Sequence, residues 1–360
     1  MGELKLMKGN EALAEAAIRA GVDAYYGYPI TPQSEVMEYL MAANPITTTG
    51  MVVLQAESET ASINMVYGAA GAGKMAMTSS SSPGISLMQE GLSYIAGAEL
   101  PCVVVNVVRG GPGLGTIQPS QADYFQTVKG GGHGDYHLIT LAPASVQEMS
   151  DFIKLAFDLA FKYRNPACIL SDGVIGQMME KVNLFDPIPR RSDDEVVSQC
   201  PWATTGRKRG SGKRIITSLN LVPQIQEAFN QHLVEKYQSI KDNEVRFEEI
   251  KCDDAEYVLV AYGSSARTGM KAVDMARQKG IKAGLLRPIT LWPFPEKEIA
   301  NLSSRVKGFL SVEMSAGQMV EDVKLAVNGK VPVQHYGRMG GMIASPADIL
   351  EALENFINSK

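Results

Sequence analysis

The hydrophobic and polar positions of residues 1–175 alternate between two spacings. Short, continuous apolar runs are typical of strands that are buried on both faces of a parallel sheet. These runs predict strands at 25–30, 51–55, 74–79, 102–108, near 137–141 and at 167–171. Between the runs, apolar residues recur every three to four positions, as they do on one face of a helix. This spacing predicts helices over 10–20, from Pro32 onward, and over 58–70, 84–97 and 146–163. The alternation indicates an α/β fold on a parallel sheet.

The first predicted helix has recognisable ends. Asn10 has a side chain suited to an N-cap, and Gly21 is typical of the residue at which a helix stops. We therefore expect Asn10 to cap the helix that begins there.

The pattern changes at residues 178–250 and then resumes. The runs RRSDDE and GRKRGSGKR are interpreted as solvated surface, and a helix is predicted near 222–240. From 254 onward, strands and helices alternate again. Strands are predicted at 257–263, 282–286, 307–313 and 331–335, and helices over 266–279, 296–302, 317–327 and 346–358. We predict an α/β domain over 1–185, a charged connection with one helix over 186–250, and a smaller α/β domain over 251–360.

Composition narrows the class of protein. Of the 360 residues, 45% are hydrophobic and 20% are charged, which is ordinary for a globular protein. The net charge of −5 argues against a general nucleic-acid binder. No apolar run approaches the roughly 20 residues that a membrane span needs, and the N-terminus lacks the apolar core of a secretory signal. We expect a cytoplasmic protein that is not bound to a membrane.

The four cysteines do not form a metal-binding pattern. They are far apart in the sequence and include no CxxC pair, so neither a zinc ribbon nor an iron–sulfur cluster is expected on this chain. Cys102 and Cys168 lie in apolar, strand-like runs and are expected to be core thiols. We predict no metal site.

The stretch GAAGAGKM at 68–75 matches the front of a nucleotide-binding P-loop, GxxxxGK. A P-loop needs a strand before its glycines and a helix after them, because only that order aims backbone N–H groups at phosphate. Here the preceding residues predict a helix and the following residues predict a strand. The position of the magnesium-binding Ser or Thr is occupied by Met75. We interpret the stretch as the C-terminal end of a helix.

Polar segments follow four of the predicted strands. They are 31–34, 57–60, 80–84 and 109–118, and they contain hydroxyls, a carboxylate at a helix start, an arginine and several glycines. In an open parallel sheet, ligands bind outside the carboxyl ends of the strands. We therefore expect one site at this edge for a polar ligand with an acidic part.

Each of these residues also has an interpretation without a ligand. Thr31 and the serines could act as N-caps, Glu59 could interact with the helix dipole, and Arg109 could form a surface ion pair. Their convergence at one edge favours the binding site over these separate explanations.

Five segments together give a specific resemblance. They are YPITPQSE at 28–35, AESETASINMVYGAAGAGK at 56–74, SSSSPG at 79–84, RGGPGLGTIQPSQAD at 109–123 and LRPITLWPFP at 286–295. They closely resemble the α subunit of 2-oxoacid:ferredoxin oxidoreductases, over nearly the whole chain and least across about 185–250. The chain is most similar to the branched-chain (2-oxoisovalerate) type, with the 2-oxoglutarate type as the close alternative.

The resemblance implies a fold and a division of labour between chains. It implies a pyrimidine-binding domain of the thiamine-diphosphate fold, followed by a smaller domain like the C-terminal domain of transketolase. Thiamine diphosphate would lie between this chain and a β subunit. That subunit would carry the diphosphate site, its Mg²⁺ and an iron–sulfur cluster. A γ subunit, a ferredoxin-like δ subunit, ferredoxin and CoA would complete the reaction, an oxidative decarboxylation of a 2-oxoacid to acyl-CoA and CO2.

One feature of the residues agrees with this division. A diphosphate site would show GDG followed about 24–30 residues later by Asn, because Mg²⁺ needs oxygen ligands that bridge the phosphates. The nearest string is Ser171-Asp172-Gly173, and the window around 196–203 contains no Asn. This chain is not expected to bind the diphosphate alone.

The resemblance also implies roles for individual residues. Glu59 would contact N1′ of the aminopyrimidine, and Thr31 and Arg109 would bind the substrate, with Arg109 donating to its carboxylate. We further expect Pro29, Ser81 and Ser82 to contact the cofactor. Three other residues are kept as candidates near the site, namely His133, Gln118 and Gly340.

Two of these candidates have specific alternatives. His133 could act as a general acid or base, or could simply be a hydrogen-bonded loop residue; metal binding with His137 is disfavoured by the intervening glycine. Gly340, in the run 337–341, could approach a phosphate of CoA. A non-catalytic binding module on the same fold is the alternative function for the whole chain.

Overall fold

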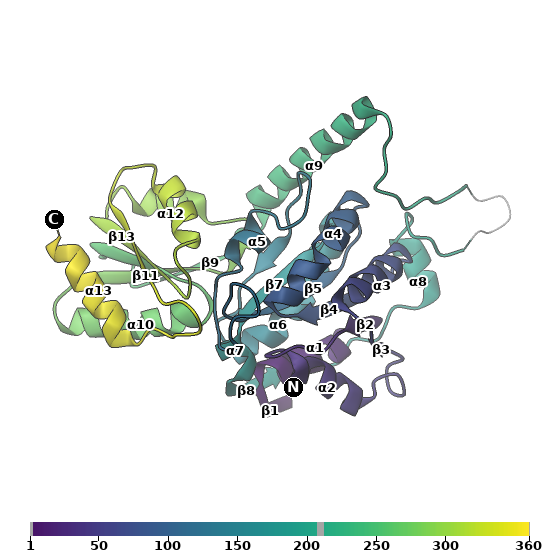
Figure 1. Ribbon diagram of the computed structural model, residues 1–360, viewed down its shortest axis with the longest axis horizontal. Helices are drawn as coiled ribbons and strands as arrows, with labels where there is room; N and C mark the ends of the chain where they lie inside the picture. The colour runs from purple at the N-terminus through teal and green to yellow at the C-terminus, as the bar shows by residue number, and fades with distance from the viewer. Residues whose placement is uncertain (1–2, 207–211, 360) are drawn as a thin grey trace.

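The computed structural model describes residues 3–206 and 212–359, which form two α/β units and the segments that join them (Figure 1). The first unit is built on a seven-stranded sheet. Its strands, in spatial order, are β12 (Thr290–Trp292), β6 (Ile139–Leu141), β7 (Ala167–Asp172), β5 (Val103–Val108), β4 (Ala76–Ser80), β2 (Ala24–Gly27) and β3 (Val52–Gln55). All pairs are parallel except β12 with β6 at the edge. The predicted parallel sheet is confirmed.

Helices cover both faces of this sheet (Figure 1). On one face α3 (Glu59–Gly71) packs against α4 (Ser82–Gly97). On the other, α1 (Gly9–Arg19) contacts both α2 (Ser34–Ala43) and α6 (Val146–Tyr163). Two short helices, α5 (Tyr124–Val128) and α7 (Gly173–Gln177), complete the unit. Because the sheet is enclosed, every residue of β5 is buried, which explains its continuous apolar sequence.

The strand order contains a topological switch point between β2 and β4. The chain moves from β2 outward to β3, and then returns to the other side of β2 to form β4 and next β5. Ligands in open α/β sheets bind in the crevice at such a point, outside the carboxyl ends of the strands. The loops that follow β2, β3, β4 and β5 lie at this edge.

The second unit has a five-stranded sheet. Its strands, in spatial order, are β14 (Val333–Gly337), β13 (Gly308–Glu313), β10 (Tyr257–Val260), β11 (Ala283–Pro288) and β9 (Phe247–Ile250), with only β9 antiparallel to its neighbour. On this unit α10 (Gly263–Gln278) packs against α13 (Pro346–Asn358), and α11 (Glu296–Leu302) packs against α12 (Met319–Val327).

Buried polar contacts join the two units. Asp172 accepts hydrogen bonds from the backbone N (3.1 Å) and Oγ (2.8 Å) of Ser264, and Gln121 Nε2 donates to the carbonyl of Tyr262 at 2.9 Å. Since these groups lie away from water, each must be satisfied by its partner, which fixes how the second unit docks.

The segment 178–250 contains more structure than the sequence indicated. The strand β8 (Met179–Leu184) pairs antiparallel with β1 (Glu3–Lys8), and α8 (Asp193–Gln199) precedes the predicted long helix, α9 (Pro223–Asn243). The strand β9 belongs to the second sheet, and β12, from the second unit's part of the chain, joins the first sheet. The proposed division at 185 and 250 stays a prediction.

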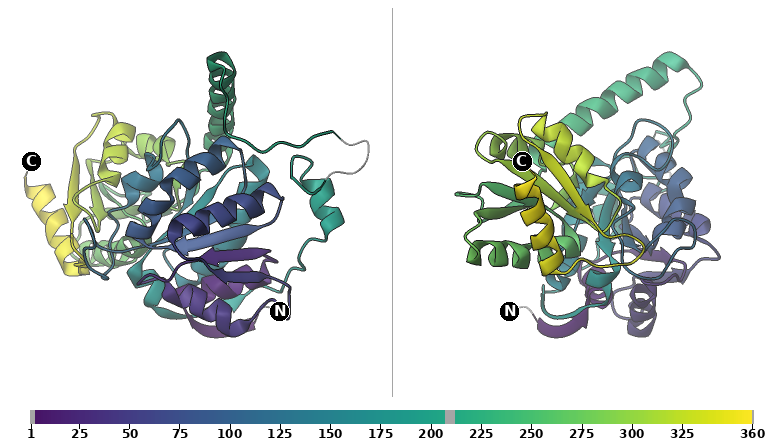
Figure 2. Two further views of the ribbon diagram at one scale, coloured as in Figure 1. Left: turned by 45° about the vertical axis from the view of Figure 1, so that its right-hand side comes forward. Right: turned by 60° about the vertical axis from the view of Figure 1, so that its left-hand side comes forward.

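Helix α9 projects from the body of the molecule (Figures 1 and 2). Only Leu233, Tyr237 and Ile240, in its C-terminal part, are buried. No helix in the described ranges combines the length and apolar character that crossing a membrane requires.

The order of elements around GAAGAGKM is the one predicted. Helix α3 ends at Gly71, Gly73 adopts a left-handed φ of 77°, and β4 begins at Ala76. The Lys74 ammonium lies 2.7 Å from the Asp193 carboxylate of α8. The stretch is therefore the end of a helix followed by a strand, and it has no P-loop geometry.

Candidate active site

Glu59 is placed at the switch point by the start of α3. The hydroxyl of the N-cap residue Ser58 accepts a hydrogen bond from the backbone N of Ala61 at 3.1 Å and so fixes the first turn. Glu59 is only 6% exposed, whereas Glu57 points to solvent. Burial thus singles out Glu59 of the two acids.

The Glu59 carboxylate lies against the first turn of α4. A Cβ atom added to Gly84 would come within 2.5 Å of Glu59 Oε1 and 2.1 Å of Ser80 Oγ. Only glycine therefore fits at position 84, because any side chain there would occupy the space of the Glu59 carboxylate. Within the described part of the chain, the Glu59 carboxylate has no hydrogen-bond or ion-pair partner.

Two serine hydroxyls at the end of β4 are also unused. Ser80 Oγ and Ser81 Oγ are buried, and neither has a hydrogen-bond partner in residues 3–206 and 212–359. Buried polar atoms are rarely left without partners, and unpaired ones often mark a ligand position. Ser80 was not among the predicted site residues, although it lies in the serine run that the sequence pointed to.

Ser82 has a different task. Its hydroxyl lies 3.1 Å from the backbone N of Arg109 and 3.2 Å from its carbonyl oxygen. Ser82 thus attaches the start of the loop after β5 to the start of α4. Its predicted contact with the cofactor stays a prediction.

Arg109 is buried beside Thr31. Its guanidinium Nη1 donates to the Thr31 carbonyl at 3.0 Å, while Nε is buried without a partner. Arg109 is 8% exposed and forms no ion pair with any described residue, so the surface ion pair considered from the sequence is not present. A buried guanidinium without a carboxylate is costly, which favours an anionic ligand at this position.

The rim of the site brings the two units together. A Cβ on Gly341 would lie 2.4 Å from Cβ of Gln118, and one on Gly110 would lie 3.3 Å from the carbonyl carbon of Gly340. The loop after β5 and the loop after β14 therefore touch. Gln118, Gly340 and Pro29 are exposed on this rim, where they could meet a ligand or another chain.

His133 is not brought to this site. Its backbone carbonyl accepts from Ser93 Oγ at 2.7 Å, and its ring meets the edge of Tyr94 with centroids 6.0 Å apart. Ser93 lies eleven residues after Ser82 on α4, and a helix rises about 1.5 Å per residue. His133 is thus about three helical turns from the start of α4, and its possible role as general acid or base finds no support within this chain.

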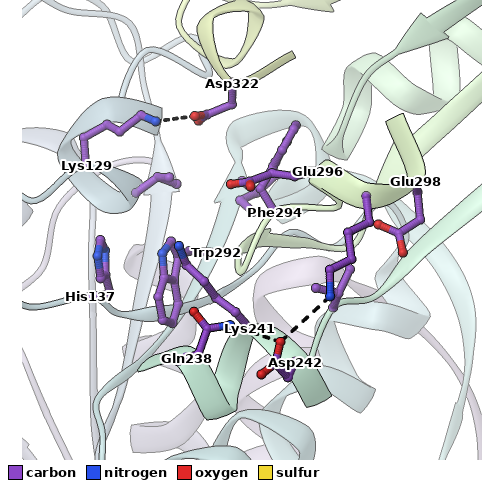
Figure 3. A pocket seen from close by; sticks show the side chains of 14 residues that line it. Lys129, His137, Gln238, Lys241, Asp242, Trp292, Phe294, Glu296, Glu298 and Asp322 are labelled. Atoms are coloured by element: carbon purple, nitrogen blue, oxygen red, sulfur yellow. Dashed lines mark hydrogen bonds and ion pairs between the residues drawn. The ribbon is translucent and has the colours of Figure 1, made fainter. Parts of the chain in front are cut away.

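A separate cavity of about 400 Å³ lies where the two units meet (Figure 3). Its wall includes the His137 ring, stacked on Trp292 with centroids 4.5 Å apart, and the ion pair between Lys129 and Asp322. None of the predicted site residues lines it. The cavity is therefore distinct from the edge that holds Glu59 and Arg109.

Metal chemistry has no apparent ligand set here. No group of three or more His, Cys, Asp or Glu side chains in the described ranges is arranged to hold a metal ion. Cys102 and Cys168 are buried, and burial raises the pKa of each thiol to about 12. Their predicted place in the core is confirmed.

Family models match both units. The model described as pyruvate flavodoxin/ferredoxin oxidoreductase, thiamine diphosphate-binding, matches residues 15–245. The model for core domain II of pyruvate:ferredoxin oxidoreductase matches residues 255–349. The chain belongs to the 2-oxoacid:ferredoxin oxidoreductase family.

Individual relatives of this oxidoreductase subunit agree. The chain is 52% identical to the ketoisovalerate oxidoreductase subunit VorB of Methanothermobacter marburgensis, over 97% of both chains. It is 36% identical to the 2-oxoglutarate synthase subunit KorA of the same organism, over 98% of this chain and 99% of that one. The resemblance stated from the sequence is confirmed.

Solved structures support the fold. A 2-oxoglutarate:ferredoxin oxidoreductase from Magnetococcus marinus superposes with a TM-score of 0.84 at 27% identity, covering 99% of this chain and 66% of that one. A split-gene transketolase superposes with a TM-score of 0.62 at 13% identity, covering 98% of both chains, which shows the shared fold alone. The predicted fold, with a pyrimidine-binding domain and a domain like the transketolase C-terminal domain, is confirmed.

The site fits the cofactor of this family. Thiamine diphosphate supplies a nucleophilic carbon and an electron sink for decarboxylation of a 2-oxoacid. The aminopyrimidine ring carries both a hydrogen-bond acceptor and a donor. Glu59 and the unpartnered hydroxyls of Ser80 and Ser81 are groups that can bind such a ring. The chemistry of these groups is therefore compatible with the pyrimidine end of the cofactor.

Proposed function

We propose that this α subunit acts on a branched-chain 2-oxoacid, of which 2-oxoisovalerate is the test case, and converts it to acyl-CoA and CO2 with reduction of ferredoxin. The observation that carries the proposal is the charge of the site. The segments 28–33, 56–59, 80–84 and 109–118 contain one cationic residue, Arg109.

One cation suits a substrate with one carboxylate. A dicarboxylate such as 2-oxoglutarate would need a second cation to offset desolvation of its second charge. Arg338, on the loop after β14, lies 3.8 Å from the Asp348 carboxylate and is already paired. The rim also exposes several apolar side chains, namely Tyr28, Leu114, Ile117, Met339 and Met342. An aliphatic substrate tail would be compatible with these surroundings.

The roles of individual residues follow from their positions. Arg109 binds the substrate carboxylate through its unpartnered Nε and remaining N–H groups, and Thr31 offers a hydroxyl from the exposed side of its loop. Glu59 shares a proton with N1′ of the aminopyrimidine, since its buried carboxyl group has no competing partner among the described residues.

A β subunit is proposed to complete the site. This chain lacks the GDG…Asn pattern for the diphosphate, and its edge strand β3 exposes Val52 and Leu54, at 40% and 44%. An unpaired sheet edge with exposed apolar side chains is a surface on which another chain can pack. The β subunit would supply the diphosphate site, Mg²⁺ and an iron–sulfur cluster, with γ and ferredoxin-like δ subunits completing the path to ferredoxin. CoA would enter at the rim near Gly340.

The proposal is tested on the co-purified complex with ferredoxin and CoA. Turnover of 2-oxoisovalerate, 2-oxoglutarate and pyruvate is measured side by side. The kcat/KM for 2-oxoisovalerate should be the highest, by about tenfold or more. One misplaced charge or lost apolar contact weakens transition-state binding by ~1.4 kcal/mol or more, which is a factor of about ten. A preference for 2-oxoglutarate would overturn the assignment of substrate. A complex without a subunit carrying GDG and cysteine clusters would overturn the assignment of partners.

A further inference from the structure

The loop that carries Thr31 is held from two sides by buried amides. On the sheet side, Gln33 is fully buried in the described structure, and its Nε2 donates to the carbonyl of Tyr28 at 3.1 Å. Its Oε1 accepts from Ser79 Oγ at 2.7 Å, and Ser79 Oγ lies 2.8 Å from Tyr25 Oη. Since the Ser79 proton goes to Gln33, Tyr25 donates to Ser79. A chain of three buried side chains therefore connects strands β2 and β4 to the start of the loop.

On the helix side, two amides meet one carbonyl. Asn10 Nδ2 donates to the carbonyl oxygen of Pro32 at 2.8 Å, and Gln177 Nε2 donates to the same oxygen at 2.9 Å. Asn10 comes from the first turn of α1 and Gln177 from the end of α7, so the bond pair ties two separate elements to the loop. The expected N-cap role of Asn10 is wrong, because the helix begins at Gly9 and the Asn10 amide is used here.

The carboxylate of Glu35 orients the same two amides. It accepts from Asn10 Nδ2 at 3.1 Å and from Gln177 Nε2 at 2.8 Å, with the Lys8 ammonium 3.5 Å away. Burial opposes its charge, but the hydrogen bonds from Gln177 and Asn10 and the charge of Lys8 hold the pKa of Glu35 below its ordinary value. As an anion, Glu35 accepts hydrogen bonds only, so it fixes which atoms of both amides face the loop.

These contacts hold the backbone on both sides of the Thr31–Pro32 pair, next to the Thr31 side chain that is proposed to bind substrate. The carbonyl of Pro32 is held by Asn10 and Gln177, and the preceding carbonyl, that of Thr31, is held by Arg109 at 3.0 Å. Two successive peptide groups are thus fixed, while the Thr31 side chain remains exposed to the site. A displacement of the Pro32 carbonyl would move Thr31, including the Thr31 carbonyl oxygen to which Arg109 donates.

We propose that Asn10 and Gln177, clamped by Glu35, are positioning residues that set the geometry of Thr31 and Arg109 for substrate binding. This inference rests on the proposed function. Neither amide touches the substrate, because both are spent on the Pro32 carbonyl on the inner side of the loop. Precise placement of binding groups is worth orders of magnitude in rate, so loosening the clamp is expected to weaken substrate binding without removing any group that contacts it.

The test uses the co-purified complex with Gln177→Met, Asn10→Leu and the double variant. Gln177→Met keeps the size and loses the amide donor. Each single variant is expected to raise the KM for the oxoacid about 3- to 10-fold with a smaller effect on kcat. The double variant should raise KM by more than the product of the single effects, because each amide partly replaces the other at one oxygen.

A matched control separates this role from general stability. Gln147 also uses its amide on a backbone, donating to the carbonyl of Asn183 at 3.2 Å and accepting from its N at 2.9 Å, but it lies on α6 away from the site. Gln147→Met should leave KM unchanged. Hydrogen exchange of a peptide covering 28–36 gives a readout without turnover, and it should speed up in Gln177→Met but not in Gln147→Met.

The outcomes are distinguishable. If the wild-type complex turns over no 2-oxoacid, the proposed function fails, while hydrogen exchange still reports on the clamp. If the wild type is active but Gln177→Met and the double variant keep the wild-type KM and the wild-type exchange of 28–36, the positioning role is overturned. A lower unfolding temperature with an unchanged KM would also overturn it, since that result indicates a structural role only.

Discussion

The guanidinium Nη1 of Arg109 lies 3.0 Å from the carbonyl oxygen of Thr31 and donates a hydrogen bond to it. This contact joins the loops that follow β5 and β2 and leaves Arg109 Nε buried without a partner. The two residues predicted to bind substrate are therefore neighbours, and one of them has unused capacity to bind an anion.

Arg109→Ala and Arg109→Lys should mainly raise the KM for the oxoacid. Hydrogen bonds to charged groups contribute about 1.5–3 kcal/mol, which corresponds to a rise of roughly 10- to 100-fold. Arg109→Lys keeps a long, positively charged side chain in the buried site, so it controls for a folding defect in Arg109→Ala. Steady-state kinetics of the complex measures the effect.

Arg305 offers a control for this experiment. It also donates to a backbone carbonyl, that of Asp253 at 3.0 Å, but it lies on the second unit away from the site. Arg305→Ala should leave KM unchanged. An unchanged KM in both Arg109 variants would remove Arg109 from the substrate site.

Lys74→Ala should leave 2-oxoacid turnover within about twofold of wild type. In residues 3–206 and 212–359 its ammonium pairs with the exposed Asp193 carboxylate alone, and a surface ion pair contributes little. Titration of the chain with ATP should show no saturable binding, since a helix precedes the glycines and a strand follows them. Saturable micromolar ATP binding that disappears in Lys74→Ala would show that the stretch is a nucleotide site after all.

His137 should make the protein less stable in mild acid. Burial lowers the pKa of its imidazole, and the nearby charges of Lys241 and Lys129 lower it further, against the opposing effects of the Val128 backbone hydrogen bond and Asp135. The folded state therefore binds fewer protons than the unfolded state below the ordinary His pKa of about 6.5. Stability should fall as pH drops through that value and be regained as pH rises.

Thermal unfolding at about pH 5.5 and 7.5 checks this expectation for the wild type and for His137→Phe. Phenylalanine can keep the stacking on Trp292, whose ring centroid lies 4.5 Å from that of His137, and it cannot take a proton (Figure 3). The variant should lose part of the acid-dependent decrease in unfolding temperature. Identical pH dependence in both proteins would show that His137 does not contribute to it.

The parts of the fold that could be predicted are those whose pattern reflects complete burial. The run VVVNVV is buried at every position, so its sequence alone predicts a central strand. The switch-point edge could also be predicted, because the loops after successive parallel strands must meet there. Glu59, Thr31 and Arg109 lie in these loops, and their individual roles were predicted from the resemblance to the family.

Other features depend on partners far away in the sequence. The strand β1 pairs with β8 more than 170 residues later, and its Leu4 and Leu6 are exposed, so neither burial nor apolar content marks it. The three-residue strand β12 exists only because the first sheet offers it an edge. Asn10 was expected to be an N-cap and no sequence pattern pointed to Gln177, yet the fold places both amides on one carbonyl.

Glu59 is the acid proposed to activate the cofactor in this 2-oxoacid:ferredoxin oxidoreductase subunit. The most direct measurement compares Glu59→Gln with Glu57→Gln in the co-purified complex, by 2-oxoisovalerate-dependent ferredoxin reduction and by bound thiamine diphosphate. Glu57 is exposed two positions before Glu59, so it is a matched control.

Glu59→Gln should lower kcat at least about 100-fold, as expected for loss of a proton-transfer group, while Glu57→Gln stays close to wild type. An intact Glu59→Gln complex that holds the cofactor and turns over within about threefold of wild type would contradict the account.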